Sequence, residues 1–295
     1  MDWNEMKKEL ARRLPSRDPL GNKGTFGTLS VVAGSALFRG AASLCSEAAL
    51  RCGVGILRLA SVEKVISAVA SRLPEAVFLP LEENAAGGIS GEDFARKLPA
   101  LASSKALLLG PGLTDSPDTA WVVEEAVKKA ACPLLLDADA LNVLKGNPLL
   151  LREAALPPVI TPHVGEMVRL CGKKIEEIKA DRREVALRYA KEWHCTVVLK
   201  DAVTAIASFD GRFFLLDSPN SGLSKGGSGD VLSGMAAAFL CEGKEGFEAA
   251  ECAVLLHSLA GRAAAERLTE SAMLPSDLLA EIPGVFTSLR PFGTP

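Results

Sequence analysis

Short apolar runs alternate with amphipathic or alanine-rich segments along most of this chain. In the first half, apolar runs at 29–33, 56–60, 76–79 and 106–109 predict buried β-strands. Segments rich in small residues or with helical periodicity lie between these runs and predict helices. A strand, a helix and a second strand in succession are typical of a parallel sheet with helices on its faces. The pattern therefore predicts an α/β fold with a mostly parallel central sheet.

The same alternation continues through the second half of the chain. Further strands are expected at 133–136, 159–160, 196–199, 205–207 and 212–216. Helices are expected at 40–52, 62–71, 91–101, 121–131, 181–193, 231–240, 246–267 and 275–281. An amphipathic helix from Trp3 to Leu14 precedes them all, and Pro15 should end it.

The composition allows one large core. The chain has 295 residues, of which 48% are apolar and 23% charged, enough for one large α/β domain or two smaller ones. No tandem repeat, low-complexity stretch or long linker divides it. We therefore expect one domain over residues 1–295, with residues 1–20 as an N-terminal helix and linker.

Charge and cysteine usage limit the classes of partner and compartment. The net charge of -3 and the scattered basic residues argue against nucleic acid or an anionic membrane as a partner. The first fourteen residues carry charges throughout, and no apolar run is long enough to span a bilayer, so we expect a cytoplasmic protein. The seven cysteines contain no CxxC pair, which favours buried, reduced thiols.

Polar residues and glycines gather just after the predicted strands. Gly112 follows one strand, Asp137, Asp139 and Asn142 follow the next, His163 and Glu166 follow the third, and Lys200 to Thr204 follow the fourth. Because the carboxyl ends of parallel strands meet at one edge of a sheet, we expect a single crevice there. A lysine and a threonine around a tight turn suit the phosphates of a nucleotide. His194 and His257 lack such a setting and are interpreted as structural.

The glycine run before the helix at 231–240 is the strongest candidate for chemistry. Gly226, Gly227 and Gly229 allow successive backbone N–H groups to point at one anion, and the positive end of the helix dipole faces the same place. Asp230 would place a carboxylate there, which suits a base that takes a proton from a hydroxyl while the amides hold a phosphoryl group. The alternative is that Asp230 is only an N-cap.

Residues 226–230 resemble the anion-hole motif of ribokinase-like proteins. The longer segment 220–234 is similar to the ADP- or ATP-dependent NAD(P)H-hydrate dehydratases of that superfamily, as are 23–27, 40–55 and the turn after residue 199. Four positions depart from the usual family residues. They are Phe26 for tyrosine, Asp201 for glycine, Ser221 for proline and Lys225 for threonine.

This resemblance implies a ribokinase-like three-layer α/β/α sandwich. It implies dehydration of the S-epimer of hydrated NADH or NADPH back to NAD(P)H, with ADP (giving AMP and phosphate) or ATP as phosphoryl donor and with Mg²⁺ as cofactor. It also implies a homo-oligomer, with a tetramer as the candidate assembly, and no epimerase domain.

The resemblance also implies a role for individual residues. Asp230, Gly227 and Gly229 would be catalytic. The hydrate would be bound by Ala41, Gly112, His163 and Asp230. The nucleotide would be bound by Lys200, Asp201, Ala202, Val203, Thr204 and Gly229. Glu166 would lie near the magnesium ion and act on it indirectly.

Two other functions remain open from the sequence. A small-alcohol kinase of the same fold, of the hydroxyethylthiazole or pyrimidine kinase type, would use the same aspartate and anion hole. His163 argues against it, because related kinases carry asparagine at that place. A non-catalytic nucleotide-binding regulator is the second alternative, and Asp230 within an intact glycine run argues against that.

Overall fold

One nine-stranded sheet runs through the protein in the order β3-β2-β1-β4-β5-β6-β7-β8-β9. The computed structural model describes residues 1–14 and 17–292. Neighbouring strands from β3 to β7 pair in parallel, whereas β8 pairs antiparallel with both β7 and β9. The strands are β1 (Thr28–Val32), β2 (Ile56–Val62), β3 (Val77–Leu81), β4 (Ala106–Leu109), β5 (Leu134–Leu136), β6 (Val159–Ile160), β7 (Thr196–Leu199), β8 (Val203–Ser208) and β9 (Phe213–Asp217). The predicted mostly parallel α/β sheet is confirmed.

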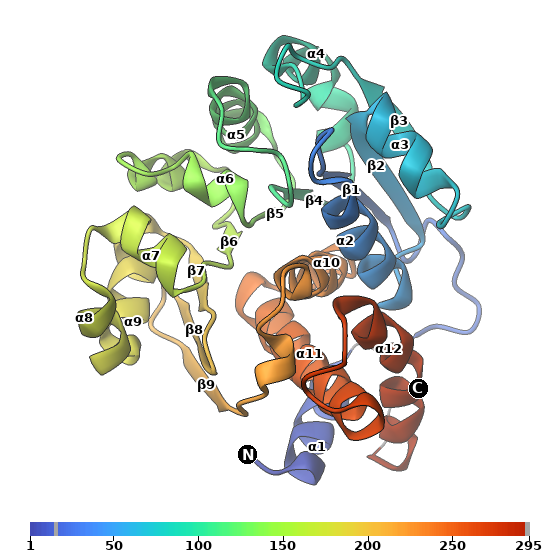
Figure 1. Ribbon diagram of the computed structural model, residues 1–295, viewed down its shortest axis with the longest axis vertical. Helices are drawn as coiled ribbons and strands as arrows, with labels where there is room; N and C mark the ends of the chain where they lie inside the picture. The colour runs from blue at the N-terminus through green and yellow to red at the C-terminus, as the bar shows by residue number, and fades with distance from the viewer. Residues whose placement is uncertain (15–16, 293–295) are drawn as a thin grey trace.

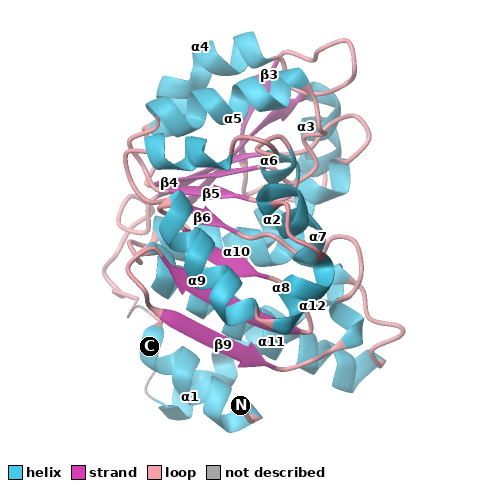
Figure 2. Cartoon of the chain, turned by 90° about the vertical axis from the view of Figure 1, so that its left-hand side faces the viewer, coloured by secondary structure: helices cyan, strands magenta, loops and turns pink. Residues whose placement is uncertain are grey.

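Helices cover both faces of this sheet (Figures 1 and 2). The helices are α1 (Trp3–Arg13), α2 (Arg39–Arg51), α3 (Glu63–Ala70), α4 (Gly91–Ala102), α5 (Pro117–Lys129), α6 (Asp139–Asn142), α7 (Val164–Cys171), α8 (Ile175–Ala180), α9 (Arg182–Trp193), α10 (Ser228–Cys241), α11 (Gly246–Leu268) and α12 (Pro275–Leu289). One layer contains α2, α3, α10, α11 and α12, and α1 packs on α11; the other contains α4, α5 and α9. The three-layer α/β/α arrangement is therefore as expected.

Several predicted boundaries were wrong. Helix α5 begins four residues before the predicted start, because Ser116 caps it and Pro117 occupies its first position. Helix α12 continues through Pro283 to Leu289, since buried residues on both sides of the proline hold it against the core. Strand β8 begins at Val203 rather than Ala205, and the short α8 was not predicted. Pro15, which was expected to end the first helix, lies outside the described residues.

Helix α10 lies at the centre of its layer. Apart from Gly229 and Asp230, every residue of this helix is buried. Its closest neighbour is α2, and the two backbones approach each other at Gly234, where a Cβ atom would lie 2.2 Å from the Cys45 carbonyl oxygen. A helix that is apolar on all sides must be enclosed by other elements. Its packing therefore holds the preceding glycine run in place.

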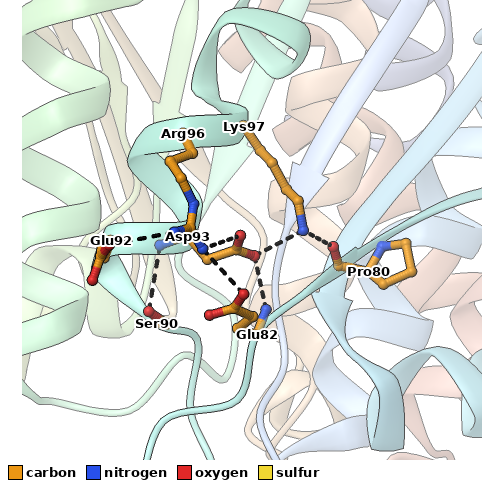
Figure 3. Close-up of polar contacts among 7 residues, drawn as sticks. All are labelled: Pro80, Glu82, Ser90, Glu92, Asp93, Arg96 and Lys97. Atoms are coloured by element: carbon orange, nitrogen blue, oxygen red, sulfur yellow. Dashed lines mark hydrogen bonds and ion pairs between the residues drawn. The ribbon is translucent and has the colours of Figure 1, made fainter.

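A buried carboxylate organises the connection between β3 and α4 (Figure 3). The Asp93 side chain is 3% exposed and accepts hydrogen bonds from Lys97 Nζ at 2.8 Å, from Arg96 Nη2 at 3.0 Å and from the Glu82 backbone N–H at 2.8 Å. Lys97 also donates to the Pro80 carbonyl oxygen. These contacts fix the beginning of α4 at the outer edge of the sheet.

Within residues 1–14 and 17–292, no helix has both the length and the apolar character needed to cross a membrane. All seven cysteines are free thiols, as expected. Six of them are buried and Cys171 is half-buried.

Replacing Gly234 with alanine should lower the free energy of unfolding by about 1–3 kcal/mol, because the new methyl group would overlap the Cys45 carbonyl and push α10 away from α2. The matched control is Gly284→Ala in α12, where nothing lies within 4 Å of the new Cβ atom. That change should raise the free energy of unfolding by up to about 1 kcal/mol, since alanine favours helix more than glycine does. Chemical denaturation measures both, and equal effects would contradict the close approach.

Candidate active site

A pocket of about 710 Å³ opens where the carboxyl ends of β5, β6 and β7 face the beginning of α10. Asp137, His163 and Lys200 line it from the strand ends, and residues 224–230 line it from the glycine run. Val254, His257 and Ser258 add a wall from α11. The structure therefore brings together segments that lie far apart in the sequence, at the edge of the sheet where a crevice was expected.

Gly227, and not Asp230, is the N-cap of α10. Gly227 has a φ of 102°, a backbone conformation that favours glycine, and a Cβ atom there would lie 2.6 Å from Leu44 Cδ1, so that this side chain would have to move. The helix starts at Ser228, which places Asp230 in its first turn. The alternative that Asp230 serves only as an N-cap is thus wrong. The Ser228 N–H donates to the Lys225 carbonyl oxygen at 3.2 Å, whereas the following N–H groups of the first turn, from Gly229 and Asp230, lie at the pocket and have no acceptor within the helix.

The Asp230 carboxylate has neither a hydrogen-bond nor an ion-pair partner among residues 1–14 and 17–292. Burial raises its pKa to about 6, and the neighbouring Asp137 and Asp139 carboxylates contribute in the same direction, while Lys200 opposes them. A carboxylate with this pKa is mostly ionised at neutral pH and can still accept a proton. Asp230 therefore has the properties of a general base.

Lys200 and Asp137 form an ion pair at the bottom of the pocket. Lys200 Nζ lies 2.8 Å from Asp137 Oδ1, and the Asp137 side chain is 1% exposed. Burial alone would lower the pKa of Lys200, but the carboxylates of Asp137, Glu166 and Asp230 raise it. The lysine is thus a permanent positive charge among three acidic groups.

His163 and Glu166 cap α7 reciprocally. His163 Nδ1 accepts hydrogen bonds from the backbone N–H groups of Gly165 and Glu166, at 2.9 and 3.3 Å, and Glu166 Oε2 accepts from the His163 N–H at 2.8 Å. Burial, followed by the charges of Lys200 and Arg169, lowers the pKa of His163, so its ring is neutral with the proton on Nε2. Burial likewise raises the pKa of Glu166.

The predicted nucleotide turn lies on the pocket wall. Lys200, Asp201, Ala202 and Thr204 line the pocket, whereas Val203 does not. The Asp201 carboxylate accepts a hydrogen bond from Arg182 at 2.9 Å and lies 3.8 Å from Lys179 Nζ. Its negative charge, unusual for the family pattern, is therefore balanced by two cations.

Ala41 and Gly112 do not line this pocket but lie against each other. A Cβ atom on Gly112 would lie 3.0 Å from Ala41 Cβ and 2.8 Å from Phe38 Cβ. Two residues along the chain, the Thr114 N–H donates to Asp139 Oδ2 at 2.8 Å. These two predicted substrate residues thus lie together outside the pocket lining, one in α2 and the other in the loop after β4.

His257 is a member of the site that the sequence did not indicate. Its Nε2 lies 3.0 Å from the Ser228 carbonyl oxygen and 3.1 Å from Ser228 Oγ. Burial lowers its pKa to about 4, so the ring is neutral. His257 therefore supports the first turn of α10. His257 and Ser258 are the two polar side chains in the apolar middle of α11, residues 252–261, and that is the pattern that could have identified His257.

Lys225 and Ser221, which depart from the family pattern, bind the connection between α11 and α12. Lys225 Nζ donates to the carbonyl oxygens of Ser271, at 2.7 Å, and of Met273. The Ser221 N–H and hydroxyl both donate to the Glu270 carboxylate. Both residues therefore hold the glycine run against residues 270–273, and the Lys225 ammonium is directed at protein carbonyls.

In the part of the chain that the structure describes, no three His, Cys, Asp or Glu side chains gather closely enough to hold a metal ion. A metal at this site would need ligands from a bound molecule as well. Glu166 is one of the carboxylates that line the pocket, together with Asp137, Asp201 and Asp230.

Comparisons with known sequences identify the family of this chain. A family model described as NAD(P)H-hydrate dehydratase matches residues 29–284. The chain is 36% identical over 278 residues to the ADP-dependent (S)-NAD(P)H-hydrate dehydratase of Xanthomonas campestris, with 94% of each protein covered. It is 37% identical to a bifunctional NAD(P)H-hydrate repair enzyme of Moorella thermoacetica, covering 94% of this chain and 52% of that protein. The chain thus spans about half the length of such bifunctional relatives.

Solved structures define the class of fold. A ribokinase-like superfamily protein from Enterococcus faecalis matches with a TM-score of 0.81 at 25% identity, covering 98% of this chain and 95% of that one. An ADP/ATP-dependent NAD(P)H-hydrate dehydratase from Bacillus subtilis, co-crystallised with ATP and Mg²⁺, matches with a TM-score of 0.84 at 30% identity, covering 96% and 97%. The protein has the ribokinase-like fold, as expected. Within that class, the chain belongs to the NAD(P)H-hydrate dehydratase family.

Replacing Lys225 with threonine should lower the free energy of unfolding by about 1 kcal/mol, because two hydrogen bonds to carbonyls are lost. The dependence of nucleotide affinity on ionic strength should stay unchanged, since the ammonium does not face a phosphate. Denaturant titration and calorimetric nucleotide titrations at two salt concentrations measure these quantities. A flatter salt dependence in the variant would instead place Lys225 on a phosphate.

Proposed function

We propose that the protein dehydrates the S-epimer of hydrated NADH and NADPH, with ADP or ATP as phosphoryl donor. The observation that carries this proposal is the Asp230 carboxylate, which has a pKa of about 6 and no partner among the described residues, in the first turn of α10 where the N-terminal end of the helix borders the pocket. Membership of the dehydratase family, and relatives named for this activity along their whole length, support the same conclusion.

The chemistry explains why a nucleotide is needed. Hydroxide is a poor leaving group, so the hydroxyl of the hydrated nicotinamide ring must be activated. Transfer of the terminal phosphoryl group of ADP or ATP to that hydroxyl forms a phosphate ester and leaves AMP or ADP. The electron pair of the ring nitrogen then expels phosphate, and loss of a ring proton restores the dihydronicotinamide. The products are NAD(P)H, inorganic phosphate and the shortened nucleotide.

Each part of the site has a task in this scheme. Asp230 removes the hydroxyl proton as the oxygen attacks, and the amides of Gly227 and Gly229 stabilise the charge on the transferred phosphoryl group. The nucleotide binds along the turn from Lys200 to Thr204, where the cations beside Asp201 keep the pocket wall from repelling its phosphates. The neutral His163 at the pocket wall positions the hydrate. Ala41 and Gly112 lie outside the pocket lining and would contact a part of the hydrate that extends beyond it.

Magnesium would be bound mostly by the nucleotide. Mg²⁺ commonly keeps several waters and takes one or two carboxylates together with phosphate oxygens. Glu166 fits the role of an indirect ligand that reaches the ion through water. When bound, the ion neutralises charge on the phosphates.

We further propose one domain over residues 1–295, a homo-oligomeric assembly, and a cytoplasmic location where the nucleotide substrates are present.

Hydrated NADH, incubated with the protein, ADP or ATP and Mg²⁺, should give one inorganic phosphate for each NADH regained. The reason is that the phosphate ester collapses in the site as the ring nitrogen expels phosphate. Absorbance of the dihydronicotinamide and a phosphate assay measure the two products. Thiazole and pyrimidine alcohols serve as comparison substrates. A stable phosphorylated alcohol without regained NADH would identify a kinase.

Asp230→Asn should reduce turnover by on the order of a hundredfold or more with little change in nucleotide affinity, because it removes the base and keeps the shape. The matched control is Asp277→Asn, which changes the third residue of α12 as Asp230→Asn changes the third residue of α10, and it should leave turnover unchanged.

In the wild type, activity should fall as pH drops through about 6, since Asp230 then becomes protonated. Full activity well below pH 5, or near-normal turnover of Asp230→Asn, would exclude this role.

A further inference from the structure

The Lys200 ammonium lies against the glycine run, and not only beside the nucleotide turn. A Cβ atom on Gly229 would lie 3.3 Å from Lys200 Nζ and 4.0 Å from Asp137 Oδ2. Gly229 is the second residue of α10, so the positive charge is adjacent to the helix amides that face the pocket. The backbone of Lys200 is fixed by a 2.8 Å hydrogen bond from its N–H to the Pro162 carbonyl oxygen.

Asp137 holds this ammonium in place. The ion pair measures 2.8 Å, the carboxylate is 1% exposed, and the Asp137 N–H donates to the Leu109 carbonyl oxygen of the neighbouring strand. Two other lysines line the pocket, but the ammonium of Lys225 binds carbonyls and that of Lys179 faces Asp201. Among the described lysines and arginines that line the pocket, Lys200 is therefore the one directed at the start of α10.

We propose that Lys200 binds the phosphoryl group that is transferred, and that Asp137 positions the Lys200 ammonium for this contact. This inference rests on the proposed function and refines it, because the turn resemblance implies only that Lys200 binds the nucleotide. Lys200 is then a catalytic residue and Asp137 a positioning residue.

The geometry suits a preorganised positive charge, whose position is fixed before the phosphoryl group is transferred. A phosphoryl group in transfer spreads negative charge over its equatorial oxygens, and a cation fixed near them needs no rearrangement when that charge develops. An ammonium group has three N–H donors, so Lys200 can keep its bond to Asp137 and still donate to a phosphoryl oxygen. Without the aspartate, the long side chain would be free to turn toward Glu166 or Asp230.

The first test compares nucleotides with and without the transferable group. In Lys200→Met, affinity for AMP should stay within about twofold, while affinity for the donor, ADP or ATP, falls roughly tenfold and kcat falls on the order of a hundredfold. Isothermal titration and product assays measure these values. Equal loss of affinity for AMP and the donor would place Lys200 on the nucleoside-proximal phosphate and overturn the proposal, as would an unchanged kcat.

The second test isolates the positioning role. Asp137→Asn should reduce kcat by on the order of tenfold, as the loss of residues that orient metal ligands does. It should have little further effect in the Lys200→Met background, because its role depends on the lysine. Additive losses in this double-mutant cycle would contradict positioning. If Lys200→Met alone does not fold, the double variant, which removes both buried charges, provides the AMP and donor comparison.

The pH profile adds a readout that structural damage would not produce. The charged and titratable groups that face Asp230 are Asp137, Asp139, Lys200 and the Cys45 thiol. Asp137 raises the pKa of Asp230 and Lys200 lowers it. The fall in kcat at low pH, which is the acid limb of the pH profile, should therefore move to lower pH in Asp137→Asn and to higher pH in Lys200→Met. Shifts in the same direction would overturn the arrangement.

The chain contains a matched control for the ion pair. Asp93 and Lys97 also form a 2.8 Å pair with a buried carboxylate, at the edge of the sheet and outside the pocket (Figure 3). Asp93→Asn and Lys97→Met should lower thermal stability and leave kcat, the AMP-to-donor affinity ratio and the acid limb of the pH profile unchanged.

Failure of the wild type to restore NADH would refute the proposed function. The ratio of AMP affinity to donor affinity would still decide whether Lys200 contacts the terminal phosphoryl group.

Discussion

Three of the carboxylates that line the pocket, those of Asp137, Glu166 and Asp230, lie close enough to raise the pKa of one ammonium group, that of Lys200. Burying several carboxylates together is unfavourable, and one lysine compensates only part of that cost. Asp137 receives the direct ion pair. Burial therefore raises the pKa of both remaining carboxylates, and Asp230 becomes a base that is ionised at neutral pH and still able to take a proton. The reactivity of the site follows from this unequal sharing of one positive charge.

The fold maintains this arrangement from two sides. The parallel strands deliver Asp137 and Lys200 to the same edge of the sheet, while α10 brings Asp230 from the opposite side. Because the rest of α10 is buried, its packing fixes the position of the first turn beside Asp137 and Lys200. The close backbone approach at Gly234 and the support of Ser228 by His257 both act on this helix. The large apolar core therefore determines the position of a few polar atoms.

Sequence alone predicted the sheet, most helices and several of the segments that line the pocket, but not the pocket wall formed by α11. Apolar runs, glycines and strand-end polar residues are local patterns, and the parallel topology brings them together without further information. The partners of individual side chains depend on distant segments and could not be predicted. Asp201 looked out of place until Arg182 was found beside it, and the contact of His257 with Ser228 could not be predicted because it joins two different helices. The boundaries of α5 and α12 were missed because caps and packing determined them.

The departures at Ser221 and Lys225 show how a loop can keep its shape while its residues change. A proline would restrict the backbone at position 221, whereas serine leaves it free and adds two donors to Glu270. A threonine at position 225 is too short to reach the α11–α12 connection, which Lys225 binds at two carbonyl oxygens. Intrinsic rigidity is thus replaced by contacts with residues 270–273. The same connection leads to Pro275, which packs against Gly227, so these contacts also hold the N-cap of the helix that carries Asp230.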